Sequence, residues 1–124
     1  MRNEISWIAT YSVRAGQLER LEALITEMVD ATAREPAALG YSFSLSEDRS
    51  TVHLYEAYED SKAAVDHMTK VFPRFAGDFF ECLTAETFVV YGTPDRAAVD
   101  IFDGLGACYM STLAGFSRRA AGVQ

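Results

Sequence analysis

The stretch VHLYEAYEDSKAAVDH, from Val52 to His67, decides how the rest of the chain is interpreted. Side chains alternate between the two faces over residues 51–58, which is the pattern of a β-strand. Glu56 shares a face with Leu54 and Tyr58 in this strand. A carboxylate on an apolar strand face is costly unless it is paired, so Glu56 is a candidate functional residue.

A helix is predicted immediately after this strand, from Asp60 to Val71. Asp60 and Ser61 offer side-chain oxygens for the N-cap, and apolar residues then recur at helical spacing. His67 lies about two turns into this helix, on its apolar side. If the helix folds back over the sheet, the imidazole of His67 and the carboxylate of Glu56 face one cavity.

The remaining elements follow from the same periodicities. The chain begins with an alternating strand (residues 5–13), an amphipathic helix (17–34), a loop (36–40) and a second strand (41–45). The Val52 strand (51–58) and its helix (60–71) follow, and then a short third helix (75–83) and a last strand (84–91). This α+β order is the split β-α-β, ferredoxin-like sandwich, with helices on one face of an antiparallel sheet. The bare face needs a cover, and a second copy of the sheet is the economical solution.

The length of 124 residues is enough for one domain and not for two. We expect a ferredoxin-like domain over residues 1–93 and a C-terminal extension over residues 94–124. Thr93 as N-cap and Pro94 at the first helical position predict a short helix to about Phe102, followed by an extended piece over residues 107–113. The extension is too apolar for a solvated tail, so we expect it to pack on the same domain.

Charge and composition narrow the possible partners. The net charge is −7 and the eleven Lys and Arg residues form no basic stripe, which argues against nucleic acid and anionic membranes. No apolar run reaches the length of a membrane span, and the start does not resemble a signal peptide, so we expect a cytoplasmic protein. Cys82 and Cys108 fit no zinc or redox spacing and are interpreted as unpaired thiols.

Three motifs within residues 5–92 carry a family resemblance. They are Tyr11-x-Val13-x-x-Gly16, Glu35-Pro36-x-x-x-Gly40-Tyr41 and Tyr55-Glu56-x-Tyr58-x-Asp60-x-x-Ala63-x-x-x-His67. With these motifs the chain resembles the antibiotic biosynthesis monooxygenase, or quinol monooxygenase-like, family of dimeric α/β barrels. That resemblance implies a homodimer whose two sheets form a barrel, with a pocket in each subunit between sheet and helices.

His67 and Glu56 are the candidate catalytic residues. An imidazole changes charge near neutral pH and suits a base that removes a phenol or enol proton. The alternative for His67 is a histidine at the edge of the core, hydrogen-bonded to a neighbour. Glu56 either orients His67 or pairs with an arginine for structural reasons. His53 lies on the opposite strand face and is interpreted as a sheet or interface residue.

Aromatic side chains are the candidate substrate-binding residues, because planar rings stack on planar ligands. The alternative is that they form an ordinary core and dimer interface. The candidates are Trp7, Tyr11, Tyr41, Tyr58, Phe72, Phe75 and Phe79.

The resemblance allows several reactions, because some members oxygenate quinols without metal or flavin, others degrade haem and others isomerise small molecules. No metal-ligand cluster or phosphate-binding loop occurs, so we expect neither a metal nor another cofactor. Haem degradation is disfavoured, because Ala9 stands where haem-degrading members carry asparagine. We expect a cofactor-independent monooxygenase for a hydroquinone or polycyclic phenol. The alternatives are a non-catalytic small-ligand-binding or regulatory module and a small-molecule isomerase.

Overall fold

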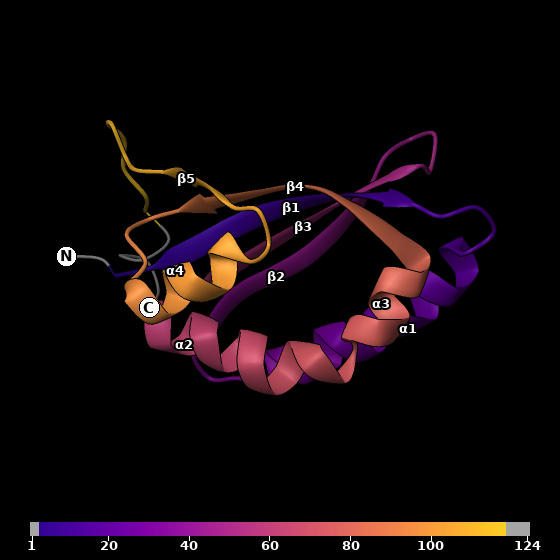
Figure 1. Cartoon of the computed structure of the whole chain (residues 1–124), viewed down its shortest axis with the longest axis horizontal. Helices are drawn as coiled ribbons and strands as arrows, with labels where there is room; N and C mark the ends of the chain where they lie inside the picture. Colours follow the sequence, from indigo (N-terminus) through magenta and orange to yellow (C-terminus); the bar gives the residue numbers. More distant parts are fainter. Residues whose placement is uncertain (1–2, 119–124) are drawn as a thin grey trace.

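In the part of the chain that the structure describes, the helices lie on one face of a five-stranded sheet and the other face is open (Figure 1). The computed structural model describes residues 3–118. The strand order is β2-β3-β1-β4-β5, in which β5 runs parallel to β4 and the other neighbours are antiparallel. The strands are β1 (Ile5–Val13), β2 (Ala38–Leu45), β3 (Thr51–Tyr58), β4 (Leu83–Tyr91) and β5 (Cys108–Met110).

The helical layer consists of a long helix and several short ones. Its members are α1 (Leu18–Ala33), α2 (Ser61–Asp66), a π-helical turn η1 (His67–Val71), a 3₁₀ turn η2 (Phe72–Arg74), α3 (Ala76–Cys82) and α4 (Arg96–Asp103). Within residues 3–118, none of these helices has the length and apolar composition needed to cross a bilayer.

The core lies between β1 at the centre of the sheet and the helices below it. Ile5, Trp7 and Ala9 alternate toward the helices and are almost fully buried. Leu21 and Met28, on the apolar side of α1, meet them from the other layer. The α+β, ferredoxin-like prediction is therefore confirmed, because alternation in the strands and helical spacing in α1 bury the same interface.

The helix predicted over residues 60–71 is not one regular α-helix. It ends at Asp66 and widens into the π-helical turn, in which the Phe72 N–H donates to the His67 carbonyl, five residues back. Pro73 has no N–H to continue the ladder, and the chain passes through the 3₁₀ turn before α3 begins. Periodicity alone does not distinguish such a wide turn from a regular one.

Two element boundaries also differ from the predictions. β2 begins at Ala38, which pairs with Tyr58, so most of the loop predicted over residues 36–40 is strand. The N-cap of α4 is Asp95, not Thr93, since the Asp95 carboxylate accepts from the Ala98 N–H at 3.0 Å. Asp95 is held there by its own N–H, which donates to Ser61 Oγ at 2.9 Å.

The C-terminal extension meets the domain over part of its length. Ala98 and Phe102 of α4 are buried, and Phe102 packs edge-on against Trp7 with ring centroids 5.1 Å apart. β5 then adds to the edge of β4, and the chain beyond it rises past the open side of the sheet (Figure 1). There Leu113 and Phe116 are 99% and 81% exposed. Residues 119–124 of the expected extension lie outside the described residues.

We predict that Phe102→Ala lowers the free energy of unfolding by about 3–5 kcal/mol, the usual cost of emptying a buried aromatic site. Leu113→Ala is the matched control, because an exposed side chain changes stability by no more than about 0.5 kcal/mol. Urea unfolding followed by tryptophan fluorescence measures both, since Trp7 contacts Phe102. Equal stabilities of the two variants would show that α4 is not part of the core.

Candidate functional site

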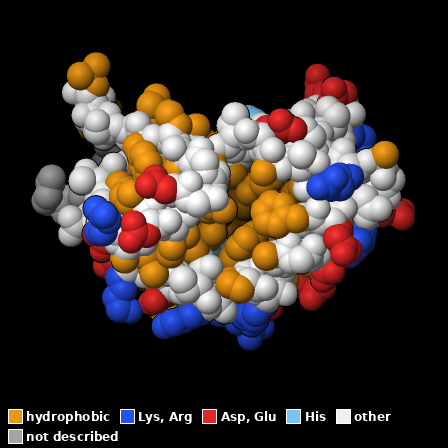
Figure 2. All heavy atoms as spheres, in the orientation of Figure 1, with side chains coloured by type: hydrophobic (Ala, Val, Ile, Leu, Met, Phe, Trp, Pro, Cys, Tyr) orange, Lys and Arg blue, Asp and Glu red, His pale blue; other side chains and the backbone are white. Residues whose placement is uncertain are grey.

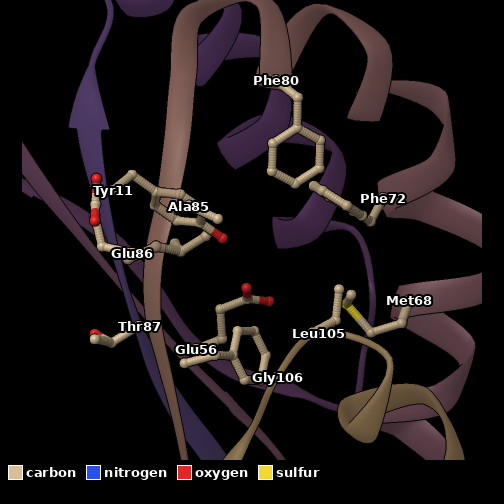
Figure 3. Close-up of a pocket in the computed structure, with 12 residues that line it drawn as sticks. Tyr11, Glu56, Met68, Phe72, Phe80, Ala85, Glu86, Thr87, Leu105 and Gly106 are labelled. Atoms are coloured by element: carbon tan, nitrogen blue, oxygen red, sulfur yellow. The ribbon is translucent and has the colours of Figure 1, made fainter.

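A cavity of about 210 Å³ lies between the sheet and the helical layer (Figure 3). The sheet side is lined by β1, β3 and β4, and the helical side carries Met68, Phe72 and Phe80. Leu105 and Gly106, from the loop after α4, close one end. On the molecular surface shown in Figure 2, apolar side chains gather in a central hollow. The cavity is therefore largely apolar and accessible from one side of the molecule.

Glu56 places its carboxylate in this apolar cavity, directed away from β3 (Figure 3). The residue is only 4% exposed. Trp7 Nε1 donates to Glu56 Oε2 at 2.8 Å, and the Tyr58 hydroxyl donates to Glu56 Oε1 at 2.6 Å. The two donors occupy one lone pair on each oxygen and fix the orientation of the carboxylate.

The environment makes Glu56 a stronger base than an exposed carboxylate. Burial raises the pKa of the Glu56 carboxyl above its usual value, and the negative charge of Glu35 adds to this increase. His67 and the hydrogen bonds from Tyr58 and Trp7 act in the opposite direction and lower that pKa, but burial is the largest effect. A carboxyl group with a raised pKa is suited to exchange protons nearer neutral pH.

His67 lies behind Glu56 and is not among the residues that line the cavity. Its ring is 1% exposed and its Nδ1 is hydrogen-bonded to Glu35 Oε2 at 2.7 Å. Its Nε2 lies 3.3 Å from Glu56 Oε1, but the alignment is not that of a hydrogen bond. Among residues 3–118, Nε2 is one of two buried side-chain polar atoms without a hydrogen-bond partner. The imidazole thus bridges two carboxylates.

The π-helical turn helps to position these groups. Because its backbone hydrogen bond spans five residues, Phe72 rather than Val71 follows His67 after one turn. His67 points inward to Glu56, while Met68 and Phe72 line the cavity. Wide turns of this kind occur often at functional sites.

The predicted aromatic residues separate into three groups. Tyr11 and Phe72 line the cavity. Trp7 and Tyr58 are fully buried in the core, with ring centroids 5.1 Å apart, and both donate hydrogen bonds to Glu56.

The other three predicted aromatic residues lie outside the cavity lining. The Tyr41 ring lies 5.7 Å from that of His67 and covers the imidazole. Phe79 is buried between α3 and the sheet, and Phe75 lies under the Arg74 guanidinium at 5.7 Å.

Several residues of the site carry no signal in the sequence that assigns them to it. Glu35 belongs to the second family motif, but nothing in that motif predicts its contact with a histidine 32 positions away. Glu86 is a second cavity carboxylate and accepts from the Ser12 hydroxyl at 2.7 Å. Leu105 lines the cavity and belongs to the C-terminal extension. Periodicity does not predict which surface of the domain that extension packs against. Phe80 is the fourth phenylalanine of the apolar 72–80 segment, and that composition was the available signal.

Binding of a metal ion would require several ligating side chains close together. Residues 3–118 contain no group of three His, Cys, Asp or Glu side chains arranged to hold a metal ion. His53 is exposed on the opposite sheet face and is not among the residues that line the cavity.

Solved structures with the same fold include three informative ones. MupZ from Pseudomonas fluorescens is 20% identical, with 97% of this chain and 93% of that chain covered and a TM-score of 0.80. SnoaB from Streptomyces nogalater, a cofactor-independent oxygenase, is 14% identical over 76% of this chain and 96% of its own, with a TM-score of 0.65. Rv0793 from Mycobacterium tuberculosis is 23% identical over 76% and 98%, with a TM-score of 0.63.

These similarities show the fold, and the family follows from the sequence itself. No curated protein matches the chain. The family model described as antibiotic biosynthesis monooxygenase matches residues 5–70, which is more than half of the chain and includes Glu35, Glu56 and His67. The chain belongs to the antibiotic biosynthesis monooxygenase family.

Proposed function

We propose that the protein is a cofactor-independent monooxygenase that oxidises a small, neutral hydroquinone or phenol in the cavity, with Glu56 as the base. The observation that carries the proposal is the Glu56 carboxylate, which is buried at the cavity wall, oriented by two donors and backed by His67. Membership of the family and the fold shared with SnoaB support the same class of reaction.

Size and charge of the cavity indicate the kind of substrate. A volume of about 210 Å³ is below the range of roughly 300–1,000 Å³ that is usual for sites of drug-sized ligands, so a small ring system is favoured. The cavity presents the carboxylates of Glu56 and Glu86, and no lysine or arginine is among its lining residues. Carboxylate or phosphate substrates would be repelled, whereas a neutral phenol is not.

The proposed reaction begins when Glu56 removes the phenolic proton. The resulting anion is electron-rich at a ring carbon and gives an electron pair to O₂, forming a C–O bond and a peroxide. Glu56 returns its proton to the peroxide, and the O–O bond breaks as the ring carbon loses its own proton. One oxygen atom remains as a carbonyl and the other leaves as water. The apolar walls exclude water while the anion exists, and the ring side chains Phe72 and Phe80 hold it against Glu56.

We also propose that the protein is a homodimer formed through the open sheet face. That face carries Ile8, Val89 and the partly exposed Tyr91, which are neighbours or near neighbours on β1 and β4. Apolar groups on a sheet without helical cover are stabilised by a second apolar layer.

The base is tested by Glu56→Gln, which keeps the size and removes the basicity. Turnover is expected to fall by about 10²–10⁴-fold, the usual contribution of a positioned base. Oxygen uptake with a panel of one- and two-ring hydroquinones measures it, and Glu27→Gln, an exposed substitution on α1, is the control. Full activity in Glu56→Gln would remove Glu56 from the mechanism. Proton exchange without oxygen uptake would favour an isomerase, and binding alone a ligand-binding module.

The pH dependence follows from the same carboxyl group. Glu56 is a base only when ionised, and its pKa is raised, so kcat/KM should fall on acidification at a pH above the ordinary carboxyl value of 4.5. His67 lowers the pKa of Glu56, so His67→Asn should move this acid limb to still higher pH. An acid limb that stays in place or moves to lower pH in His67→Asn would contradict the assignment.

The dimer is tested by light scattering at micromolar concentration, where we expect twice the chain mass of 13.7 kDa. Ile8→Glu places a charge on the open face without touching the helix side and should shift the mass toward the monomer. A wild-type protein of 13.7 kDa would contradict the proposal.

A further inference from the structure

Three ionisable groups form a continuous line from the surface to the cavity. The Glu35 side chain is 19% exposed, whereas those of His67 and Glu56 are 1% and 5% exposed. Glu35 Oε2 lies 2.7 Å from His67 Nδ1, and His67 Nε2 lies 3.3 Å from Glu56 Oε1. Both imidazole nitrogens therefore face carboxylate oxygens, one at the surface and one at the cavity.

A bound substrate ring would block the route by which a proton on Glu56 could leave through the cavity. Met68, Phe72 and Phe80 form an apolar wall, and in the proposed complex the ring would fill the space between this wall and the carboxylate. Tyr58 and Trp7 already donate to Glu56 and cannot accept its proton. Nε2 of His67 is the nearby nitrogen that can, and among the described residues it has no competing hydrogen-bond partner.

We propose that Glu35 is the outer end of a proton path that connects Glu56, through His67, to solvent. The proposal builds on the function proposed above, but the path exists without substrate. Glu35 acts through His67 and is a positioning residue, because it does not touch the cavity.

The path consists of proton transfers alone, and no electrons move. The Oε1–H bond of Glu56 breaks as the Nε2–H bond of His67 forms. The Nδ1–H bond breaks as an Oε2–H bond forms on Glu35, which releases a proton to water. The reverse sequence returns a proton to Glu56 and restores the first tautomer. In the proposed oxidation Glu56 returns its proton directly to the peroxide, and the path equilibrates the protonation state of Glu56 with solvent between turnovers.

Other groups around His67 keep the path in place. The Tyr41 ring covers one side of the imidazole with centroids 5.7 Å apart, and the Tyr58 ring lies 5.1 Å away. Burial and the negative charge of Glu56 raise the pKa of both tyrosines, so each stays protonated and neither interrupts the path.

The test is the rate at which the ring N–H of His67 exchanges with solvent, measured by nitrogen-15 NMR on the protein without substrate. Glu35→Gln keeps a hydrogen-bond acceptor for Nδ1 but cannot take the proton, so exchange should slow by roughly tenfold, an order below the contribution of a positioned base. His53, the other histidine, is exposed and serves as the internal reference. Glu27→Gln, on the surface of α1, is the matched control and should leave both signals as in the wild type.

Exchange at His67 that is as fast in Glu35→Gln as in the wild type would overturn the proposal. If Glu35→Gln does not fold, Glu35→Met tests the same point, because it fills the space without a proton acceptor. With a hydroquinone that the wild type oxidises, Glu35→Gln should also slow steady-state turnover more than the first turnover, and added imidazole buffer should restore it. If the wild type oxidises no hydroquinone, the proposed function fails, and the exchange rate still decides whether the path exists.

Discussion

The site depends on one constraint, which is that a carboxylate buried among aromatic rings must be satisfied by hydrogen bonds. Glu56 meets this requirement with Trp7 and Tyr58, two core residues whose rings also pack on each other. The donors thus belong to the packed core. An unpaired charge would be destabilised by such burial, but the paired carboxylate of Glu56 is held in one orientation and has a raised pKa.

The fold was predictable because it rests on local patterns. Alternation over residues 5–13 and helical spacing in α1 determine which side chains are buried, and the three motifs identified the family. The site was predictable only in part. Glu56 and His67 were predicted as candidates because one is a charged residue on an apolar strand face and the other an imidazole on an apolar helix side. Their order relative to the cavity and the contact of Glu35 with His67 depend on packing between distant segments, which no local pattern records.

The extension shows the same limit in a different way. Its apolar composition indicated burial, and Phe102 does complete the core beside Trp7. Composition does not say which chain or which surface receives each side chain, however. Leu105 contributes to the cavity, β5 extends the sheet, and Leu113 stands in solvent. One segment thus supplies core, cavity and exposed surface between Phe102 and Leu113.

The π-helical turn after α2 has a consequence for comparing this chain with its relatives. A turn that holds one additional residue shifts the numbering of everything beyond it by one position relative to a regular helix. Counting four residues on from His67 leads to Val71, but in this structure it is the Phe72 N–H that bonds to the His67 carbonyl across the turn. An ungapped alignment with a relative that has a regular helix would therefore match the wrong residues through η2 and α3. Equivalent cavity residues in such a relative are found by superposition, with a one-residue gap inside the turn.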